Sequence, residues 1–365
     1  MEQNSNCLLL IGSYSSAEAQ GLHTYSWDSL KEGGLRALNG AGGLANPTFL
    51  SVDQERNIFY TFGESEGKPV KEAVVAAYSF EPATGMIREL NRSAAIPAGE
   101  KPTTLCHIAK DPLSKYLVVC SYHGGAVGLL RLLEDGRVGE LCDTQHHTGH
   151  GADPKQQDRP HPHSAVFSPD GNYIFVSDLG LDIIRTYKLD YEAGKLVPQG
   201  DTRLYPGAGP RHFVFHPDGK TAYVIGELGS TVTSFRYDPA AGELHTVQTV
   251  STLPEGYEGE NGCAEIVVTP DGKFVYGSNR GHDSIAVFAV GEDPASLVPA
   301  GHTPTRGGHP RHFALTPDGD ELICANRDGA ENLVVFTIDK ESGGLTYTGH
   351  SATLPKPVCV IPVRR

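Results

Sequence analysis

One short pattern recurs along the chain and constrains its fold more than any other feature. It consists of an alternating apolar stretch, a Pro-Asp-Gly turn and a second apolar stretch, as in residues 163–178. Apolar residues at every second position predict strands, and Pro-Asp-Gly predicts a tight turn, so each copy predicts a β-hairpin. The turn prolines are Pro169, Pro217, Pro270 and Pro317. Their spacing of about 50 residues is typical of propellers and other repeat architectures.

Two further strand-like segments follow each hairpin, which predicts a four-stranded antiparallel blade as the repeat unit. Two more blades begin at Asn46 and Lys101. The segments left over, one C-terminal and three N-terminal, are 356–363, 7–14, 21–27 and 34–38. Together they complete a seventh blade, and this closure removes the exposed edges of an open array. We therefore predict an all-β, seven-bladed propeller closed by pairing the two ends of the chain.

The length of 365 residues is then accounted for by a single propeller domain, 1–365. The expected blades span roughly 46–100, 101–145, 160–205, 206–255, 260–305, 306–350, and 351–365 with 5–45. Almost no helix is expected, because no segment has a helical period with suitable caps. The polar connection 143–159 is long and is interpreted either as a lid or as a solvated loop.

Charge and cysteine content narrow the class of protein. The formal net charge of -14 argues against nucleic acid or an anionic membrane as the main partner, since either requires a basic face. The seven cysteines are scattered without metal or disulfide spacing, and the N-terminal apolar run Cys7–Ile11 is too short for a signal peptide or a membrane span. We expect a cytoplasmic protein that is a monomer or weak homo-oligomer, and Asn91 to lie in a chance glycosylation motif.

Two positions per blade break the repeat, and they meet at one mouth of the central channel because a hairpin starts and ends at the same edge. At the start of the first strand the successive blades carry Thr48, Thr103, His163, Arg211, Ala264, Arg311 and Val358. After the second strand they carry Tyr14, Glu64, Tyr122, Leu179, Glu227, Arg280 and Arg327. Structural positions should repeat and chemical ones should not, so these two rings are the predicted site.

The residue types indicate the chemistry. Arginines present planar charged forks that suit carboxylate or phosphate, so a small anionic substrate is expected. A neutral histidine beside a carboxylate can take and return a proton near pH 7. The chain has no Gly-rich phosphate loop or nucleophile elbow, and no cysteine lies in either predicted ring. Attack by water on an activated ester, without a cofactor, fits these residues best.

Four segments carry a resemblance to a known family: His161–Phe167, Gly209–Phe213, Gly226–Leu228 and Ser278–Ile285. They resemble the seven-bladed lactonases, which include propeller-type 6-phosphogluconolactonases and the fungal 3-carboxy-cis,cis-muconate lactonising enzyme. The resemblance implies catalytic roles for His163, Arg211, Glu227 and Arg280, the residues that the rings also single out. Residues expected to bind substrate are Arg311, Arg327, Glu64, His161 and Asn279. In the expected mechanism Arg211 and Arg280 hold the anion and the oxyanion, while His163, oriented by Glu227 or acting with it, moves the proton.

Two other classes remain open. A metal site is one, because five histidines lie close in the sequence and four asparagines could imitate a calcium cage, although the intervening arginines oppose a cation. They are His146, His147, His150, His161 and His163, and Asn46, Asn261, Asn279 and Asn326. A propeller that only binds a protein or peptide is the other. Among lactones, a phosphosugar lactone, an aldono- or aldarolactone, and carboxymuconate cycloisomerisation are all compatible with the sequence.

Overall fold

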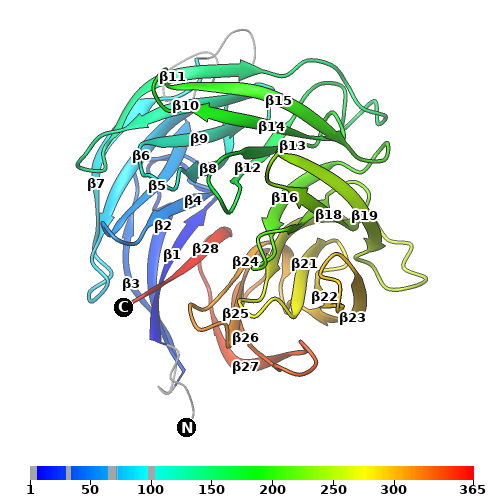
Figure 1. Ribbon diagram of the computed structural model, residues 1–365. Coiled ribbons are helices and arrows are strands. Elements are labelled where there is room, and N and C mark those ends of the chain that lie inside the picture. Colours follow the sequence, from blue (N-terminus) through cyan, green and yellow to red (C-terminus); the bar gives the residue numbers. More distant parts are fainter. Residues whose placement is uncertain (1–5, 30–33, 65–70, 72, 98–102) are drawn as a thin grey trace.

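The structure is a computed structural model that describes residues 6–29, 34–64, 71, 73–97 and 103–365. The strands of the first sheet are β1 (Asn6–Ser13), β2 (Leu22–Asp28), β3 (Leu35–Ala41) and the C-terminal β28 (Pro357–Arg364). β28 pairs antiparallel with β1, from Cys7 opposite Arg364 to Ser13 opposite Pro357. The predicted pairing of the chain ends is therefore confirmed (Figure 1).

Six further four-stranded sheets follow in chain order. The second and third contain β4 (Leu50–Asp53), β5 (Ile58–Glu64), β6 (Ala73–Phe80) and β7 (Ile87–Ala94), then β8 (Leu105–Lys110), β9 (Tyr116–Ser121), β10 (Ala126–Leu132) and β11 (Val138–His146). The fourth and fifth contain β12 (Pro162–Phe167), β13 (Ile174–Asp178), β14 (Ile183–Asp190) and β15 (Lys195–Arg203), then β16 (Pro210–Phe215), β17 (Thr221–Gly226), β18 (Thr231–Asp238) and β19 (Glu243–Ser251). The last two contain β20 (Gly262–Val268), β21 (Phe274–Arg280), β22 (Ser284–Val290) and β23 (Leu297–Pro304), then β24 (Gly308–Leu315), β25 (Glu321–Asp328), β26 (Leu333–Ile338) and β27 (Leu345–Ala352).

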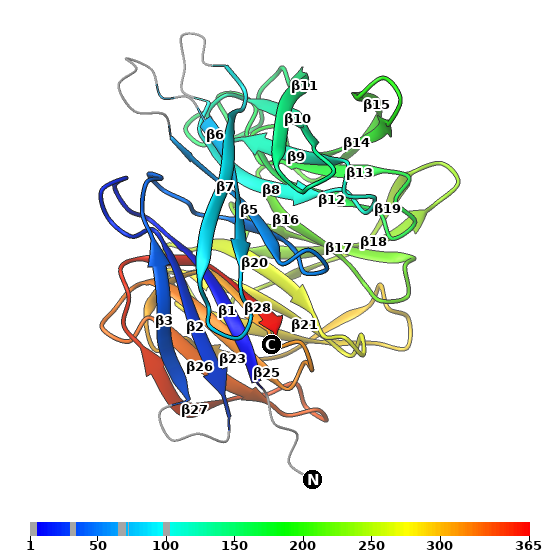
Figure 2. The ribbon, with the colours of Figure 1, turned by 90° about the vertical axis from the view of Figure 1, so that its left-hand side faces the viewer.

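The first strands of the seven blades form a closed inner ring. Each contacts the next, from β4 through β8, β12, β16, β20 and β24 to β28, and β28 contacts β4. The fourth strands, such as β3 and β7, lie at the periphery (Figure 2). The fold is thus the predicted seven-bladed propeller, and the described residues contain no helix long and apolar enough to cross a membrane.

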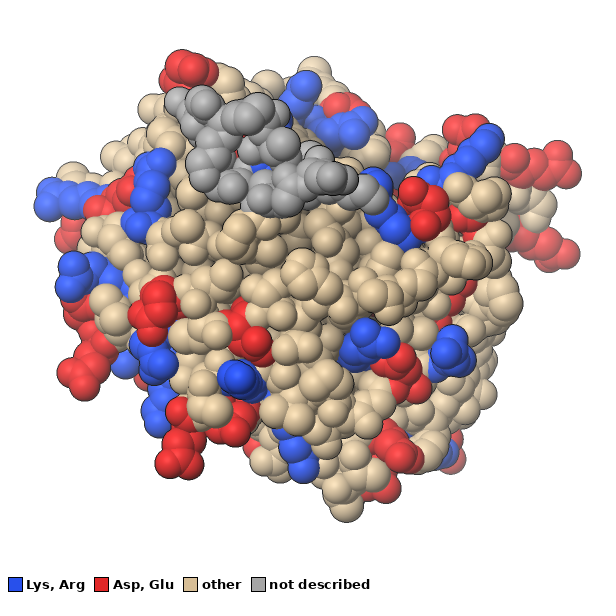
Figure 3. Space-filling model, turned by 90° about the horizontal axis from the view of Figure 1, so that it is seen from above, with Lys and Arg blue, Asp and Glu red and all other residues tan. Residues whose placement is uncertain are grey.

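The core is divided among the contacts between neighbouring blades. In one of them Val118 and Leu129 pack with Ala165 and Val176 of the next blade, and all four are buried. Alternate residues of a strand face opposite sides of its sheet, so each sheet contributes to two such clusters. On the outside, acidic and basic side chains are interspersed over the face seen in Figure 3.

An irregularity in the first strands aims side chains into the channel. The pairing register shifts between Pro162 and Ser164, and it shifts in the same way in β8, β16 and β24. Each shift leaves one extra residue, a β-bulge, which changes the direction of a side chain. In β12, β16 and β24 a proline precedes the bulge residue. Proline is tolerated there because a residue at a strand start or bulge does not have to donate a backbone hydrogen bond to the neighbouring strand. His163, Arg211 and Arg311 therefore occupy equivalent positions, as the repeat predicts.

The third blade, formed by β8–β11, corrects one sequence assignment. Its bulge falls between Leu105 and His107, so Cys106 and not Thr103 is the residue equivalent to His163. The Thr103 hydroxyl is buried and donates to the Ile96 carbonyl at 2.6 Å. Cys106 stands six residues before Pro112, as His163 stands before Pro169, but the Pro112 turn lacks the Asp-Gly that marks the other copies. The statement that no cysteine lies in either ring is wrong for the same reason.

The loop before β12 is anchored to the fourth blade by buried polar residues. His147 Nδ1 lies 2.6 Å from Asp178 Oδ2 and its Nε2 lies 2.8 Å from the Tyr187 hydroxyl. The amide of Gln157 donates to Leu179 and Asp182 and accepts from two backbone N–H groups of the loop. Buried groups bonded in this way fix the backbone, so the structure favours a fixed loop over the lid interpretation.

Candidate active site

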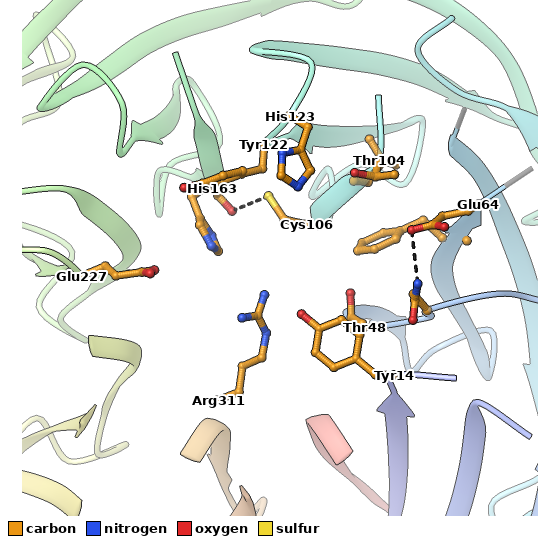
Figure 4. Close-up of a pocket in the computed structure, with 14 residues that line it drawn as sticks. Tyr14, Thr48, Glu64, Thr104, Cys106, Tyr122, His123, His163, Glu227 and Arg311 are labelled. Atoms are coloured by element: carbon orange, nitrogen blue, oxygen red, sulfur yellow. Dashed lines mark hydrogen bonds between the residues drawn. The ribbon is translucent and has the colours of Figure 1, made fainter. Parts of the chain in front are cut away.

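A cavity of about 260 Å³ opens at the mouth of the channel where both rings meet. This volume is near the lower end of the range for small-molecule sites. Its lining comes from six of the seven blades and the ends of their first and second strands. The residues that line it are Tyr14, Asn46, Thr48, Phe62, Gly63, Glu64, Thr104, Leu105, Cys106, Tyr122, His123, His163, Glu227 and Arg311. Figure 4 shows ten of these side chains arranged around the open centre.

One side of the cavity is built on a charged cluster. Glu227 Oε1 lies 2.8 Å from Arg280 Nη2, and its Oε2 lies 2.9 Å from Arg211 Nε. Arg211 also donates to the Ala264 carbonyl at 2.7 Å, and Arg280 donates to the carbonyls of Gly262 and Cys263. Glu227 lines the cavity while Arg211 is only 2% exposed. The two arginines predicted to hold the anion are therefore held by Glu227 and by backbone.

Arg311 differs from these two arginines in its surroundings. It lines the cavity, and its guanidinium carbon lies 5.6 Å from the centre of the Tyr14 ring. A guanidinium that faces the cavity and stacks on an aromatic ring keeps donors available for an incoming oxyanion. Of the three arginines, Arg311 is thus the one whose side chain lines the cavity.

The cluster carries more positive than negative charge. Burial and the neighbouring Arg311 and Arg280 lower the pKa of Arg211 to about 9, and Glu227 opposes this effect. For Glu227, burial raises the pKa, but Arg280 and Arg211 together hold it below its usual value. All three arginines and Glu227 are therefore charged at pH 7. The excess positive charge in a partly enclosed site favours an anionic ligand.

His163 lines the cavity, and its ring points toward the open centre (Figure 4). Its ring meets Tyr122 edge to face, with centres 5.7 Å apart. Burial lowers the pKa of His163 well below 6.5, and Arg211, His212 and Arg311 lower it further. The imidazole is therefore neutral at pH 7 and can accept a proton. Both oxygens of Glu227 lie at arginines, and the described part of the structure shows no hydrogen bond between Glu227 and His163, so the expectation that Glu227 orients His163 or acts with it stays a prediction.

Four other predicted substrate-binding residues have separate positions. Glu64 lines the cavity, where it accepts from Asn46 Nδ2 at 3.2 Å and pairs with Lys71. His161 stacks on Tyr122 with ring centres 4.1 Å apart, behind the lining. Asn279 is fully buried and donates to the Thr252 carbonyl, which is a structural bond. Arg327 pairs with its neighbour Asp328. Of the four, only Glu64 lines the cavity.

The five histidines considered for a metal site do not come together as a binding site in the described part of the chain. Within 6–29, 34–64, 71, 73–97 and 103–365, the structure has no group of three His, Cys, Asp or Glu residues placed to hold a metal ion. His147 and His161 point to different partners, Asp178 and the Tyr122 carbonyl.

Cys106 donates to the carbonyl groups of residues 120, 162 and 163, and burial raises its pKa to about 12, so its thiol is not activated as a nucleophile.

Comparison with known proteins decides the family. Residues 8–362 match the family described as "Lactonase, 7-bladed beta-propeller". The chain belongs to this lactonase family. It is 36% identical over 350 residues to a 6-phosphogluconolactonase of Bacillus subtilis, with 96% of each chain covered, and 31% identical to one of Formosa agariphila, with 92% of this chain and 94% of that one covered.

Solved structures of this lactonase family agree with that assignment. A putative 6-phosphogluconolactonase from Bacteroides fragilis is 32% identical with a TM-score of 0.88, and each chain is covered to 98%. A periplasmic gluconolactonase of Pseudomonas aeruginosa is 28% identical with a TM-score of 0.89, covering 98% of this chain and 99% of that one. The relatives thus carry names for two sugar lactones, one phosphorylated and one not.

Proposed function

We propose that the protein hydrolyses a sugar lactone, with 6-phosphogluconolactone as the first candidate substrate. The observation that carries the proposal is the placement of neutral His163, charged Arg311 and the Arg-paired Glu227 around one cavity. This arrangement supplies a proton acceptor and an anion-binding group on facing walls. The names of the relatives from Bacillus subtilis and Formosa agariphila favour the phosphorylated substrate.

In the proposed mechanism each charged group has one role. His163 takes a proton from the attacking water and later gives it to the ring oxygen of the lactone. Arg311 donates hydrogen bonds to an anionic oxygen of the substrate or to the developing carbonyl oxyanion. Glu227 keeps Arg211 and Arg280 in place, so that their positive field also stabilises negative charge in the cavity. No cofactor takes part.

The proposal is tested by measuring acid release from 6-phosphogluconolactone, gluconolactone and a muconolactone, each corrected for spontaneous hydrolysis. We expect the phosphorylated lactone to have the highest kcat/KM. Preference for gluconolactone would favour an aldonolactonase, the alternative that the Pseudomonas aeruginosa relative supports by name. Turnover of the muconolactone alone would favour cycloisomerase chemistry, and no turnover of any of the three would contradict the proposal.

Arg311→Gln is expected to raise KM for 6-phosphogluconolactone by about 10-fold to 100-fold, since a hydrogen bond to a charged group contributes about 1.5–3 kcal/mol. KM for uncharged gluconolactone should change by less than about threefold, because it lacks the anionic group. Steady-state kinetics on both lactones measure this difference. Arg306→Gln is the control, because Arg306 stacks on Tyr347 outside the cavity. An equal loss on both lactones would contradict anion binding by Arg311.

A further inference from the structure

A second layer of polar side chains lies in the channel beside His163. Its members occupy the positions that follow the bulge in the first strands, and all are buried. They are His107, Ser164, His212, Glu265 and His312. Phe49 packs against three of the imidazoles, with ring centres 4.4–5.6 Å away. A buried carboxylate and three imidazoles in one layer are costly to desolvate unless their hydrogen bonds are satisfied.

Glu265 organises this layer. Its two oxygens lie 2.9 and 3.0 Å from His212 Nδ1, and Oε2 lies 3.2 Å from His312 Nε2. The backbone N–H of Ile266 donates to Oε1 at 3.0 Å. An ionised carboxylate only accepts, so Nδ1 of His212 carries the proton and its Nε2 carries a lone pair.

Two buried imidazole nitrogens in this region have no hydrogen-bond partner among the residues that the structure describes. They are Nε2 of His212 and Nδ1 of His163. The two rings contact each other edge to face at 66°, with centres 5.3 Å apart. An unsatisfied buried polar atom costs about 1–3 kcal/mol. One donor and one acceptor in adjacent rings satisfy each other if a water molecule bridges them.

We propose that Glu265 and His212 are positioning residues that keep the proton of His163 on Nδ1, so that Nε2 of His163 presents a lone pair to the cavity. This inference rests on the lactone hydrolysis proposed above. Glu265 accepts from His212, and His212 Nε2 accepts from His163 Nδ1–H through one water. In other enzymes a carboxylate sets the tautomer of a catalytic histidine by a direct hydrogen bond. Here the series of hydrogen bonds is longer by one imidazole.

The proton balance is closed in this scheme. Nε2 of His163 takes the proton of the attacking water as the oxygen bonds to the lactone carbonyl carbon. The same proton passes to the ring oxygen when the ring C–O bond breaks, which leaves the hydroxy acid and neutral His163. Between the two transfers the His163 imidazolium is stabilised by the series of hydrogen bonds that ends at Glu265.

Charged groups from several blades determine the pH dependence. Burial lowers the pKa of both His163 and His212, and Arg211, Arg280 and Arg311 lower it further, while Glu227 partly offsets this effect at His212. Burial raises the pKa of Glu265, while His312 and Arg211 oppose this. Burial lowers the pKa of His312 to about 4 and that of His107 below its usual value. Activity should therefore fall on the acid side as Glu265 is protonated and no longer accepts from His212.

The first test is Glu265→Gln, which keeps the shape and removes the charge. We expect kcat to fall by about 10-fold to 100-fold, as for other residues that orient a functional histidine, with KM nearly unchanged and the acid limb of the kcat profile moved to lower pH. The matched control is Glu321→Gln, since Glu321 is buried and accepts from Trp27 Nε1 away from the channel. Its pH profile should remain that of the wild type.

A second readout does not depend on turnover. In the ¹⁵N NMR spectrum of the histidine-labelled protein, the signals of His163, assigned by their loss in His163→Gln, should be those of the Nδ1–H tautomer. His212→Asn keeps a donor to Glu265 but removes Nε2, and it should shift His163 toward the Nε2–H tautomer. Thermal unfolding confirms that each variant is folded.

The outcomes separate this inference from the proposed function. A wild-type protein that hydrolyses no lactone contradicts the function, while the tautomer of His163 still tests the positioning chain. The positioning role would be overturned if Glu265→Gln kept the wild-type kcat and the wild-type acid limb. An Nε2–H tautomer of His163 in the wild-type protein would also overturn it, even if lactone hydrolysis is established.

Discussion

Replacement of His163 with alanine is expected to lower kcat for lactone hydrolysis by about 10²-fold to 10⁴-fold, the usual contribution of a positioned general base. The His163 side chain is 4% exposed and lines the cavity. KM should change little, because Arg311 and not His163 binds the anionic group in the proposed mechanism. Steady-state kinetics with the preferred lactone measure both constants.

The pH profile adds an independent check on His163. Burial and the nearby arginines lower its pKa well below 6.5, so the base is already neutral at pH 6.5. The wild-type rate should therefore not fall in the range where a free imidazole takes up its proton. His245→Ala is the control, since His245 is exposed on the outer strand β19. A His163→Ala variant within threefold of the wild-type rate would remove His163 from the mechanism.

The fold was accessible from the sequence because its repeat is local. Each Pro-Asp-Gly turn lies between two alternating apolar strands, and four copies suffice to set the period. Ring closure also follows, since three strands at one end of the chain and one at the other make a complete blade. The third blade cannot be aligned in the same way, because its turn at Pro112 lacks Asp-Gly and the equivalence of Cys106 and His163 is therefore hidden in the sequence.

The candidate site was only partly accessible. Singling out the non-repeating positions found His163, Glu227 and Arg311, which share the cavity. The same rule excludes the residues of the channel layer from the predicted site. His107, His212 and His312 recur at equivalent positions, and the rule interprets a recurring position as structural. The segment Pro-Arg-His-Phe occurs twice, at 210–213 and 310–313, and this repetition of a polar residue in a strand was the missed signal.

The different contacts that the arginines make could not be predicted from the sequence and are known only from the structure. Arg211 and Arg311 are equivalent in the repeat, yet Arg211 pairs with Glu227 and Arg311 lines the cavity beside Tyr14. The difference arises from the second strand of each blade, since Glu227 follows β17 while the exposed Arg327 ends β25. A sequence gives the residues at both ends of a hairpin but not which of them meet across blades.

Glu227→Gln is expected to lower the free energy of unfolding by about 3–5 kcal/mol, because it leaves two arginines in a desolvated site without their counter-charge. The carboxylate is 22% exposed, and Arg211 and Arg280 are 2% and 9% exposed. Denaturant unfolding at pH 7 measures the change. Glu140→Gln, which breaks an ion pair with Arg131 on the surface, should cost less than about 1 kcal/mol.

The pH dependence of this stability has a defined sign. The folded state holds the pKa of Glu227 below its ordinary value, so its contribution is fully present above the unfolded pKa of about 4.3. It is lost as the pH falls through the lower, folded pKa. The difference between wild type and Glu227→Gln should therefore shrink on the acid side of pH 4.3.

A double variant distinguishes a lost pair from a general loss of packing. Glu227→Gln combined with Arg280→Gln removes one of the unpaired charges, so its unfolding free energy should lie closer to the wild type than the sum of the single losses predicts. Strict additivity, or a loss below about 1 kcal/mol in Glu227→Gln, would mean that the carboxylate does not hold the arginines. In that case Arg211 and Arg280 would be available to bind substrate, and the assignment of the anion to Arg311 would fail with it.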